Sequence, residues 1–280
     1  MRTESGQVDA GIAVARDYYD SAEADDFYAS VWGGEDIHIG LYDTTDDIRT
    51  ASRLTVDRMI EKLGPLAGKR VIDLGAGYGG AARVLAGEHG AHVTCLNLSA
   101  VENERNRALT AAAGLGERIT VVDGSYDAMP FEDARFDIAW SQDAILHAPD
   151  RGKVLDETAR VLKPGALFAF TDPMQADNIE DTGVLRSIYD RIHLPDLASI
   201  GFYRDALARR GFEEAQVEEL TRQLGRHYSR VREVMLERRE ELGLDDGFVE
   251  RMSEGLGHWV EGAAKGHLSW AIMLFRKAKR

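Results

Sequence analysis

The chain has 280 residues, of which 48 are acidic and 34 are lysine or arginine, so its formal net charge is −14. This acidic balance argues against general nucleic-acid binding, which depends on neutralising phosphates with basic side chains. The single cysteine, Cys95, excludes an intramolecular disulfide framework and a cysteine-rich zinc site, and we expect no metal site. No apolar run approaches the roughly 20 residues that cross a bilayer, and the first residues lack the apolar core of a secretion signal. We therefore expect a cytoplasmic globular protein that does not associate with membranes.

From about residue 70 onward, strand-like and helix-like segments alternate. The expected strands are Arg70–Leu74, Ala91–Leu96, Ile119–Val122, Phe136–Trp140 and Ala166–Thr171, and the expected helices are Gly79–His89, Ser99–Ala113 and Arg151–Leu162. Ser99 is a candidate N-cap, and Pro164-Gly165 should stop the last of these helices. This order predicts an α/β fold, in which a parallel sheet carries helices on both faces.

Three stretches lie outside this alternation. Residues 1–69 are expected to form an N-terminal helical cap or lid, and residues 70–280 the main domain. The main domain contains insertions at about 172–199 and 221–262, of which the second is rich in charged helix formers. His267–Arg276 regains strand character and could close the sheet. Long excursions of this kind are often lids or substrate-binding elements.

A glycine-rich loop, DLGAGYGG, follows the first expected strand and opens the first expected helix. Gly75 and Gly77 would let the backbone turn tightly and approach a ligand without a Cβ. The spacing also fits G-x-G-x-x-G, but a nicotinamide enzyme usually places a carboxylate about 20 residues later. The chain instead has Asn97 there, and it lacks a Tyr-x-x-x-Lys pair. A nicotinamide-binding oxidoreductase or a non-catalytic Rossmann-type module is therefore the less favoured alternative.

Further residues make the interpretation of this loop more specific. Asp73 lies directly before it, and Met129-Pro130-Phe131 with Phe136-Asp137 precedes or opens the fourth expected strand. Over about residues 68–172 the chain resembles the class I S-adenosylmethionine-dependent methyltransferases. The resemblance implies a Rossmann-like, seven-stranded, mostly parallel sheet with an N-terminal helical cap and a helical insertion before the last strand. It also implies S-adenosylmethionine as the cofactor.

The same resemblance implies which residues bind this cofactor. Asp73, Gly75 and Gly77 would hold its methionine part, Asn97 would hold the ribose, Leu98 would lie beside the adenine, and Ser125 and Tyr126 would contact the adenine. Ile37 and His38 would line the cofactor side of the cap. The sequence departs from the common pattern at two of these positions, because Asn97 replaces an acidic residue and Ser125 replaces an aspartate.

Segments on either side of the loop point to a narrower group. The sequences WGGEDIHIG, NLSxxxNERN and SQDAILH are similar to those of the sarcosine/dimethylglycine N-methyltransferases, which complete the synthesis of glycine betaine. This resemblance spans nearly the whole chain and implies methylation of dimethylglycine, and also of sarcosine, in osmolyte synthesis. It places Pro173 and Met174 beside the acceptor. The alternative acceptors are phosphoethanolamine, whose methyltransferases share DAILH, and a natural-product hydroxyl.

Candidate catalytic residues follow from position and from this resemblance. His147 follows the fourth expected strand, at the sheet edge where open α/β folds bind ligands, and could act as a base or orient one. In the phosphoethanolamine methyltransferases, which this chain also resembles, the matching histidine pairs with an N-terminal tyrosine. The resemblance implies Tyr19 as its counterpart here, or Tyr18 if the alignment shifts by one residue. Asp143 could attract a cationic amine.

The acceptor itself suggests further binding residues. A quaternary ammonium product favours aromatic walls, for which Trp32 and Tyr203 are candidates. A substrate carboxylate needs a cationic or multi-donor partner, and Arg204 is one candidate. We expect a small-molecule amine as the substrate and a monomer or homodimer as the assembly.

Overall fold

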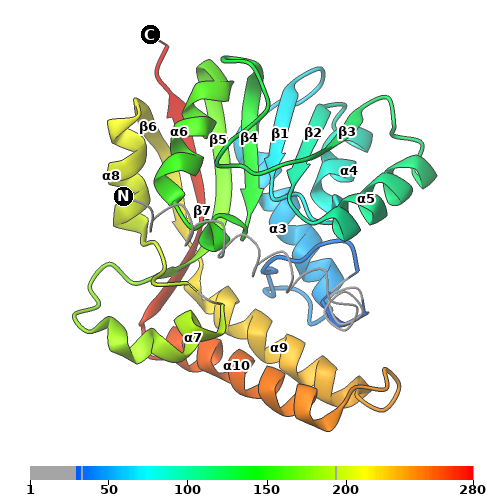
Figure 1. Ribbon diagram of the computed structural model, residues 1–280, viewed down its shortest axis with the longest axis vertical. Coiled ribbons are helices and arrows are strands. Elements are labelled where there is room, and N and C mark those ends of the chain that lie inside the picture. The colour runs from blue at the N-terminus through cyan, green and yellow to red at the C-terminus, as the bar shows by residue number, and fades with distance from the viewer. Residues whose placement is uncertain (1–29, 33, 193, 280) are drawn as a thin grey trace, which may run out of the picture.

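The computed structural model describes residues 30–32, 34–192 and 194–279 (Figure 1). Seven strands form one sheet in the order β3-β2-β1-β4-β5-β7-β6. They are β1 (Arg70–Leu74), β2 (His92–Asn97), β3 (Ile119–Asp123), β4 (Phe136–Gln142), β5 (Leu162–Gln175), β6 (Phe212–Glu219) and β7 (Leu268–Lys277). Only β7 runs antiparallel to its neighbours, β5 and β6. The expected seven-stranded, mostly parallel sheet is confirmed.

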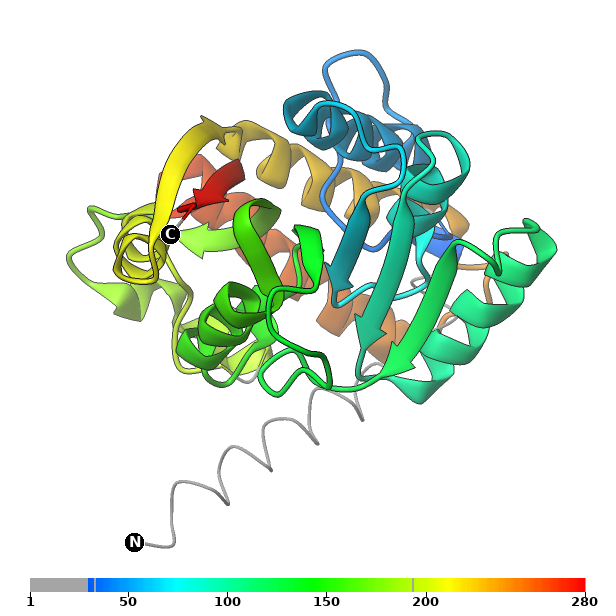
Figure 2. The ribbon, with the colours of Figure 1, turned by 90° about the horizontal axis from the view of Figure 1, so that it is seen from above.

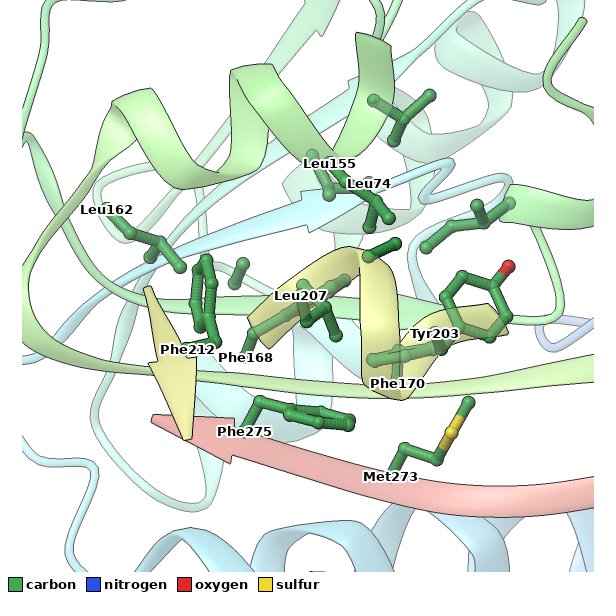
Figure 3. Packing of buried hydrophobic residues seen from close by; sticks show 14 of the residues in the cluster. Leu74, Leu155, Leu162, Phe168, Phe170, Tyr203, Leu207, Phe212, Met273 and Phe275 are labelled. Atoms are coloured by element: carbon green, nitrogen blue, oxygen red, sulfur yellow. The ribbon is translucent and has the colours of Figure 1, made fainter. Parts of the chain in front are cut away.

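Helices cover both faces of this sheet, and Figure 2 shows α3 and α6 on opposite sides of it. The helices α3 (Ile48–Leu63) and α4 (Gly80–Gly87) share a buried core with one face, and α6 (Arg151–Val161) and α8 (Ile200–Arg209) share another with the opposite face. The two faces have separate cores because the side chains along each strand alternate between faces, as β5 illustrates. Phe168 and Phe170 contact the α6 and α8 side (Figure 3), whereas Ala169 lies on the α3 and α4 side.

The expected helical insertion before the last strand is confirmed by α9 (Thr221–Arg238) and α10 (Asp246–Ala264). With α7 (Arg186–Arg191), they lie beyond the sheet end at which β7 begins (Figure 1). Because β7 is antiparallel, that end holds the carboxyl ends of the parallel strands. A third core, which includes Trp32, Leu146, Tyr228 and Trp259, joins these helices to the sheet. The helices therefore cover the edge at which a ligand of this fold class would bind.

Helix α3 falls within the stretch expected to be a cap, yet it packs as a sheet helix. Val56 and Met59 are fully buried in the same core as Val71 of β1. Asp47 caps the helix by accepting a hydrogen bond from the Thr50 amide at 2.8 Å. The division of the chain at residue 69 stays a prediction.

Two elements differ from the expectations. Strand β5 runs from Leu162 to Gln175, because its pairing with β7 continues from Leu167 to Gln175. The preceding helix ends at Val161, before Pro164-Gly165 as expected, and these two residues lie at the start of β5. Residues 172–175, expected to begin an insertion, are the end of the same strand. Strand β6 was not expected, because most of its side chains are exposed at the sheet edge and its sequence, FEEAQVEE, shows little apolar alternation. In the part of the chain that the structure describes, no helix is long and apolar enough to cross a membrane.

Candidate cofactor and acceptor site

The glycine-rich loop connects β1 to α4, and its backbone is tied to β2. The Gly75 amide donates to the Leu96 carbonyl at 2.8 Å. Gly75 and Gly77 have φ values of 74° and 50°, in the left-handed region that glycine adopts without steric cost. A Cβ on Gly75 would lie 2.5 Å from the Ala144 Cβ, whereas a Cβ on Gly77 would meet no protein atom within 4 Å. Gly77 therefore borders open space, which a larger side chain would fill.

That space is a cavity of about 860 Å³, including its open mouth. It lies at the carboxyl ends of the parallel strands. Most of the predicted cofactor-binding residues line it, namely Ile37, Gly75, Gly77, Asn97, Leu98, Ser125 and Tyr126. The predicted catalytic residues Asp143 and His147 line the same cavity. The fold thus gathers side chains from five separate parts of the sequence around one space large enough for a nucleoside-bearing cofactor.

A carboxylate that was not anticipated lies in the predicted ribose corner. Glu102 lines the cavity, and its Oε2 accepts a hydrogen bond from Asn97 Nδ2 at 2.8 Å. The Glu102 amide donates to Ser99 Oγ at 3.2 Å, so this carboxylate belongs to the first turn of α5 (Ala100–Ala112). The signal in the sequence is the capping-box pattern S-x-x-E, which directs the glutamate back toward the start of its helix. Glu102 supplies beside Asn97 the acidic group that the sequence lacks at position 97.

Asp73 and His38 lie close to the loop but do not line the cavity themselves. Asp73 is buried, and burial raises the pKa of its carboxyl group to about 7. Within the described residues, no hydrogen bond reaches this carboxyl group. Burial opposes protonation of His38, but the ion pair with Asp36, whose Oδ1 lies 3.5 Å from His38 Nε2, outweighs it and raises the pKa of His38. A buried carboxylate without a hydrogen bond suits a cationic group such as the ammonium of a methionine moiety.

Asp143 joins the cavity to the N-terminal part of the chain. Its Oδ2 accepts from the Ile39 amide at 2.7 Å, and its Oδ1 accepts from Trp270 Nε1 at 2.8 Å. It adopts a φ of 50°, which is unusual for a residue with a Cβ, and its amide donates to the Thr171 carbonyl at 3.0 Å. Burial raises the pKa of Asp143, while the Ile39 amide and the charge of His38 oppose that rise.

His147 is held in a short turn that is fastened to β5. This 3₁₀ turn, Ile145–His147, places the Leu146 amide 3.0 Å from Asp172 Oδ1. The other carboxyl oxygen of Asp172 accepts from the Tyr203 hydroxyl at 2.5 Å, and burial raises the pKa of Asp172 to about 7. Burial and the nearby charge of Arg151 lower the pKa of His147 to about 4. His147 is therefore a neutral imidazole at physiological pH.

The predicted acceptor residues are more scattered, and none of the described ones lines the cavity. Met174 is fully buried in the core shared with α6 and α8, and Pro173 is buried beside it in β5. Tyr203 is fully buried as well. Trp32 packs in the third core, its ring centroid 5.1 Å from that of His227.

The remaining acceptor predictions lie on the surface or outside the description. Arg204 is exposed on α8, and its Nε lies 2.7 Å from Glu214 Oε2. Tyr18 and Tyr19 lie outside the described residues. The assignments of residues to the acceptor site stay predictions.

The loop, the cavity and the strand order define a methyltransferase of the class I, S-adenosylmethionine-dependent type. A family model described as a methyltransferase domain matches residues 72–170. A phosphoethanolamine N-methyltransferase of Haemonchus contortus, solved with S-adenosylhomocysteine, is 20% identical and has a TM-score of 0.80, over 94% of this chain and 60% of that one. At that identity the likeness supports the fold alone.

Two curated relatives narrow the class. A sarcosine/dimethylglycine N-methyltransferase of Halorhodospira halochloris is 50% identical, over 96% of this chain and 98% of the relative. A dimethylglycine N-methyltransferase of Parasynechococcus marenigrum is 53% identical, over 96% of this chain and 97% of the relative. A solved Galdieria sulphuraria protein described as a sarcosine dimethylglycine methyltransferase is 42% identical with a TM-score of 0.87, over 92% of this chain and 99% of that one. The chain belongs to the sarcosine/dimethylglycine N-methyltransferase family, and its cofactor is S-adenosylmethionine.

Proposed function

We propose that this protein methylates dimethylglycine to glycine betaine, and that it also accepts sarcosine. The observation that carries the proposal is the close similarity, over nearly the full length of both chains, to relatives named for these two substrates. The role is the synthesis of an osmolyte. The similarity to phosphoethanolamine methyltransferases is much lower, which makes the phosphorylated acceptor the weaker candidate.

The chemistry of the reaction sets what the site must do. The bound cofactor supplies an electrophilic methyl group, so the protein mainly has to position the amine and exclude water. The amine must present its lone pair, and an ammonium substrate must therefore lose a proton before transfer. The product of the last methylation is quaternary and has no further proton to release.

We assign to His147 the role of a neutral hydrogen-bonding group that orients the acceptor. Its lowered pKa supports this role over that of a general base. A group with a pKa of about 4 is a weak base, and it is almost entirely unprotonated at neutral pH. Asp143 would act on the cationic amine through its charge, because both of its carboxyl oxygens already accept hydrogen bonds from protein donors. Tyr19, or Tyr18, would complete the acceptor site from the N-terminal segment.

On the cofactor side, Asn97 and Glu102 would hold the ribose hydroxyls together. The amide of Asn97 donates to Glu102, which orients the carboxylate toward the cavity that both residues line. Leu98, Ser125 and Tyr126 would surround the adenine. We also propose a cytoplasmic location, supported by the acidic composition, and a monomer or homodimer.

A methyl-transfer assay tests the proposal. The protein is incubated with S-adenosylmethionine and glycine, sarcosine, dimethylglycine or phosphoethanolamine, and products are identified by mass. We expect betaine from dimethylglycine. If S-adenosylhomocysteine binds but neither dimethylglycine nor sarcosine is methylated, the acceptor assignment is wrong. His147→Ala should lower turnover more than affinity for S-adenosylhomocysteine, and an unchanged rate would leave His147 a structural residue.

A further inference from the structure

The side-chain amide of Gln142 has a fixed orientation at the wall of the cavity. Its Oε1 accepts a hydrogen bond from Trp140 Nε1 at 3.0 Å. An indole can only donate, so the oxygen of the amide must face Trp140 and the NH₂ group must be its other end. Gln142 lines the cavity, and its Nε2 is buried without a hydrogen-bond partner. Buried polar groups are almost always paired, so this donor is expected to have a ligand as its partner.

Three other side chains around the cavity already donate to protein acceptors. Asn97 donates to Glu102, Ser125 donates to Asp127, and the Tyr126 hydroxyl donates to the Ala144 carbonyl. Among the described lining residues there is no lysine or arginine. Among the lining side chains, the amide of Gln142 is the donor that is buried without a protein partner, and it is therefore suited to a carboxylate that enters this cavity.

The position of Gln142 relative to Asp73 indicates which carboxylate this is. Asp73 of β1 pairs in register with Trp140 of β4, and Gln142 is two residues further along β4. Residues two apart on a strand share a face, so Asp73 and Gln142 point to the same side of the sheet, with Cα atoms about 8 Å apart from standard strand spacings. A buried carboxylate and a buried NH₂ group thus lie side by side next to the glycine loop. This pair complements a zwitterionic α-amino acid group, with the ammonium toward Asp73 and the carboxylate toward Gln142.

We infer that the Gln142 amide is the hydrogen-bond donor for the α-carboxylate of the methionine moiety of the cofactor. The acceptor amino acid also carries a carboxylate. We assign this donor to the cofactor because Gln142 shares a sheet face with Asp73 and lies next to the glycine-rich loop, where the methionine moiety is expected.

The test compares two ligands that differ only in that carboxylate. S-adenosylhomocysteine and its decarboxylated analogue, which keeps the amine, are titrated calorimetrically into the wild type and into Gln142→Leu and Gln142→Glu. The leucine variant removes the donor. The glutamate variant keeps an acceptor for Trp140 and so preserves the local packing. The matched control is Gln216→Leu, on the exposed strand β6.

We expect both variants to bind S-adenosylhomocysteine about 10- to 100-fold more weakly, the usual range for a hydrogen bond to a charged group. The decarboxylated analogue should bind the wild type, Gln142→Leu and Gln216→Leu with the same affinity, and should bind Gln142→Glu at least as tightly because its ammonium gains a nearby carboxylate. This binding also shows that the variants are folded. Equal weakening of both ligands would overturn the inference, since Gln142 would then only shape the cavity. Unchanged binding of S-adenosylhomocysteine would overturn it too, and a raised KM for dimethylglycine would then assign the donor to the acceptor.

Discussion

A buried histidine in the helical insertion before the last strand is expected to contribute to acid sensitivity. His227 on α9 is fully buried, and its Nδ1 accepts from the Tyr42 hydroxyl at 2.8 Å and from the Gly40 amide at 3.2 Å. Burial, helped by the charge on His38, lowers the pKa of His227 to about 3 from its usual 6.5. The unfolded chain therefore binds a proton below pH 6.5 that the folded chain does not bind, and stability is lost as the pH falls from 6.5 toward 3.

The size of this loss follows from the two pKa values. Between pH 7 and pH 4.5 a single group of this kind costs about 2.5 kcal/mol of the free energy of unfolding. The substitution His227→Gln keeps a carbonyl that can accept from Gly40 and Tyr42 but removes the titration. The variant should therefore lose about 2.5 kcal/mol less than the wild type over this pH interval.

Urea unfolding at pH 7 and pH 4.5 measures the difference directly. The difference between the two pH values matters here, because the substitution also changes stability at pH 7. Gln216→Leu, at an exposed position of β6 and without a titratable group, is the control and should leave the pH dependence as it is in the wild type. Equal losses in the wild type and in His227→Gln would refute the reasoning, since His227 would then be protonated without cost in the folded state.

Three further substitutions separate site residues from structural ones. Gly77→Val should abolish calorimetric binding of S-adenosylhomocysteine, because a branched side chain would enter the cavity; Gly114→Val, with the same left-handed strain but open space around it, should still bind. Normal binding by Gly77→Val would remove the loop from the cofactor site. Met174→Ala should lower the free energy of unfolding by about 2–5 kcal/mol, as truncation of a buried side chain does, and unchanged thermal stability would contradict its place in the core. Arg204→Ala should change stability by less than about 1 kcal/mol, because its ion pair with Glu214 is exposed. The KM for dimethylglycine tests its predicted acceptor role, which an unchanged KM would contradict.

The convergence of most predicted cofactor-binding residues on one cavity could be predicted, because it depends on local sequence. The run Arg70–Leu74 is a short apolar strand with glycines directly after it, and the structure gives it the same bounds. Parallel strands bring their carboxyl ends together, so Gly77, Asn97 and Ser125 had to converge once the strands were assigned. Glu102 was missed, although its capping pattern with Ser99 was present in the sequence.

The surroundings of the predicted acceptor residues were harder to predict, because the burial of their side chains depends on tertiary contacts. The alternation in β5 could have placed Met174 on the same face as Phe168 and Phe170, but only once the strand was known to extend past Thr171. That extension comes from pairing with β7, almost a hundred residues away. The orientation of Gln142 likewise depends on the indole of Trp140, and the isolation of Arg204 depends on its pairing with β6 through Glu214.

The backbone of residues 39–42 has a consequence for motion. Four consecutive amides donate to four different places: Ile39 to Asp143, Gly40 to His227, Leu41 to the Ala51 carbonyl, and Tyr42 to Gln223 Oε1. These acceptors belong to the cavity rim, to α9 and to α3. None of these elements can therefore separate from the others without breaking at least one of the four hydrogen bonds. Their hydrogens should exchange with solvent together, at a rate set by the opening of the whole assembly. A cofactor that binds only the closed arrangement would slow the exchange of all four amides together, so their exchange rates would report its binding.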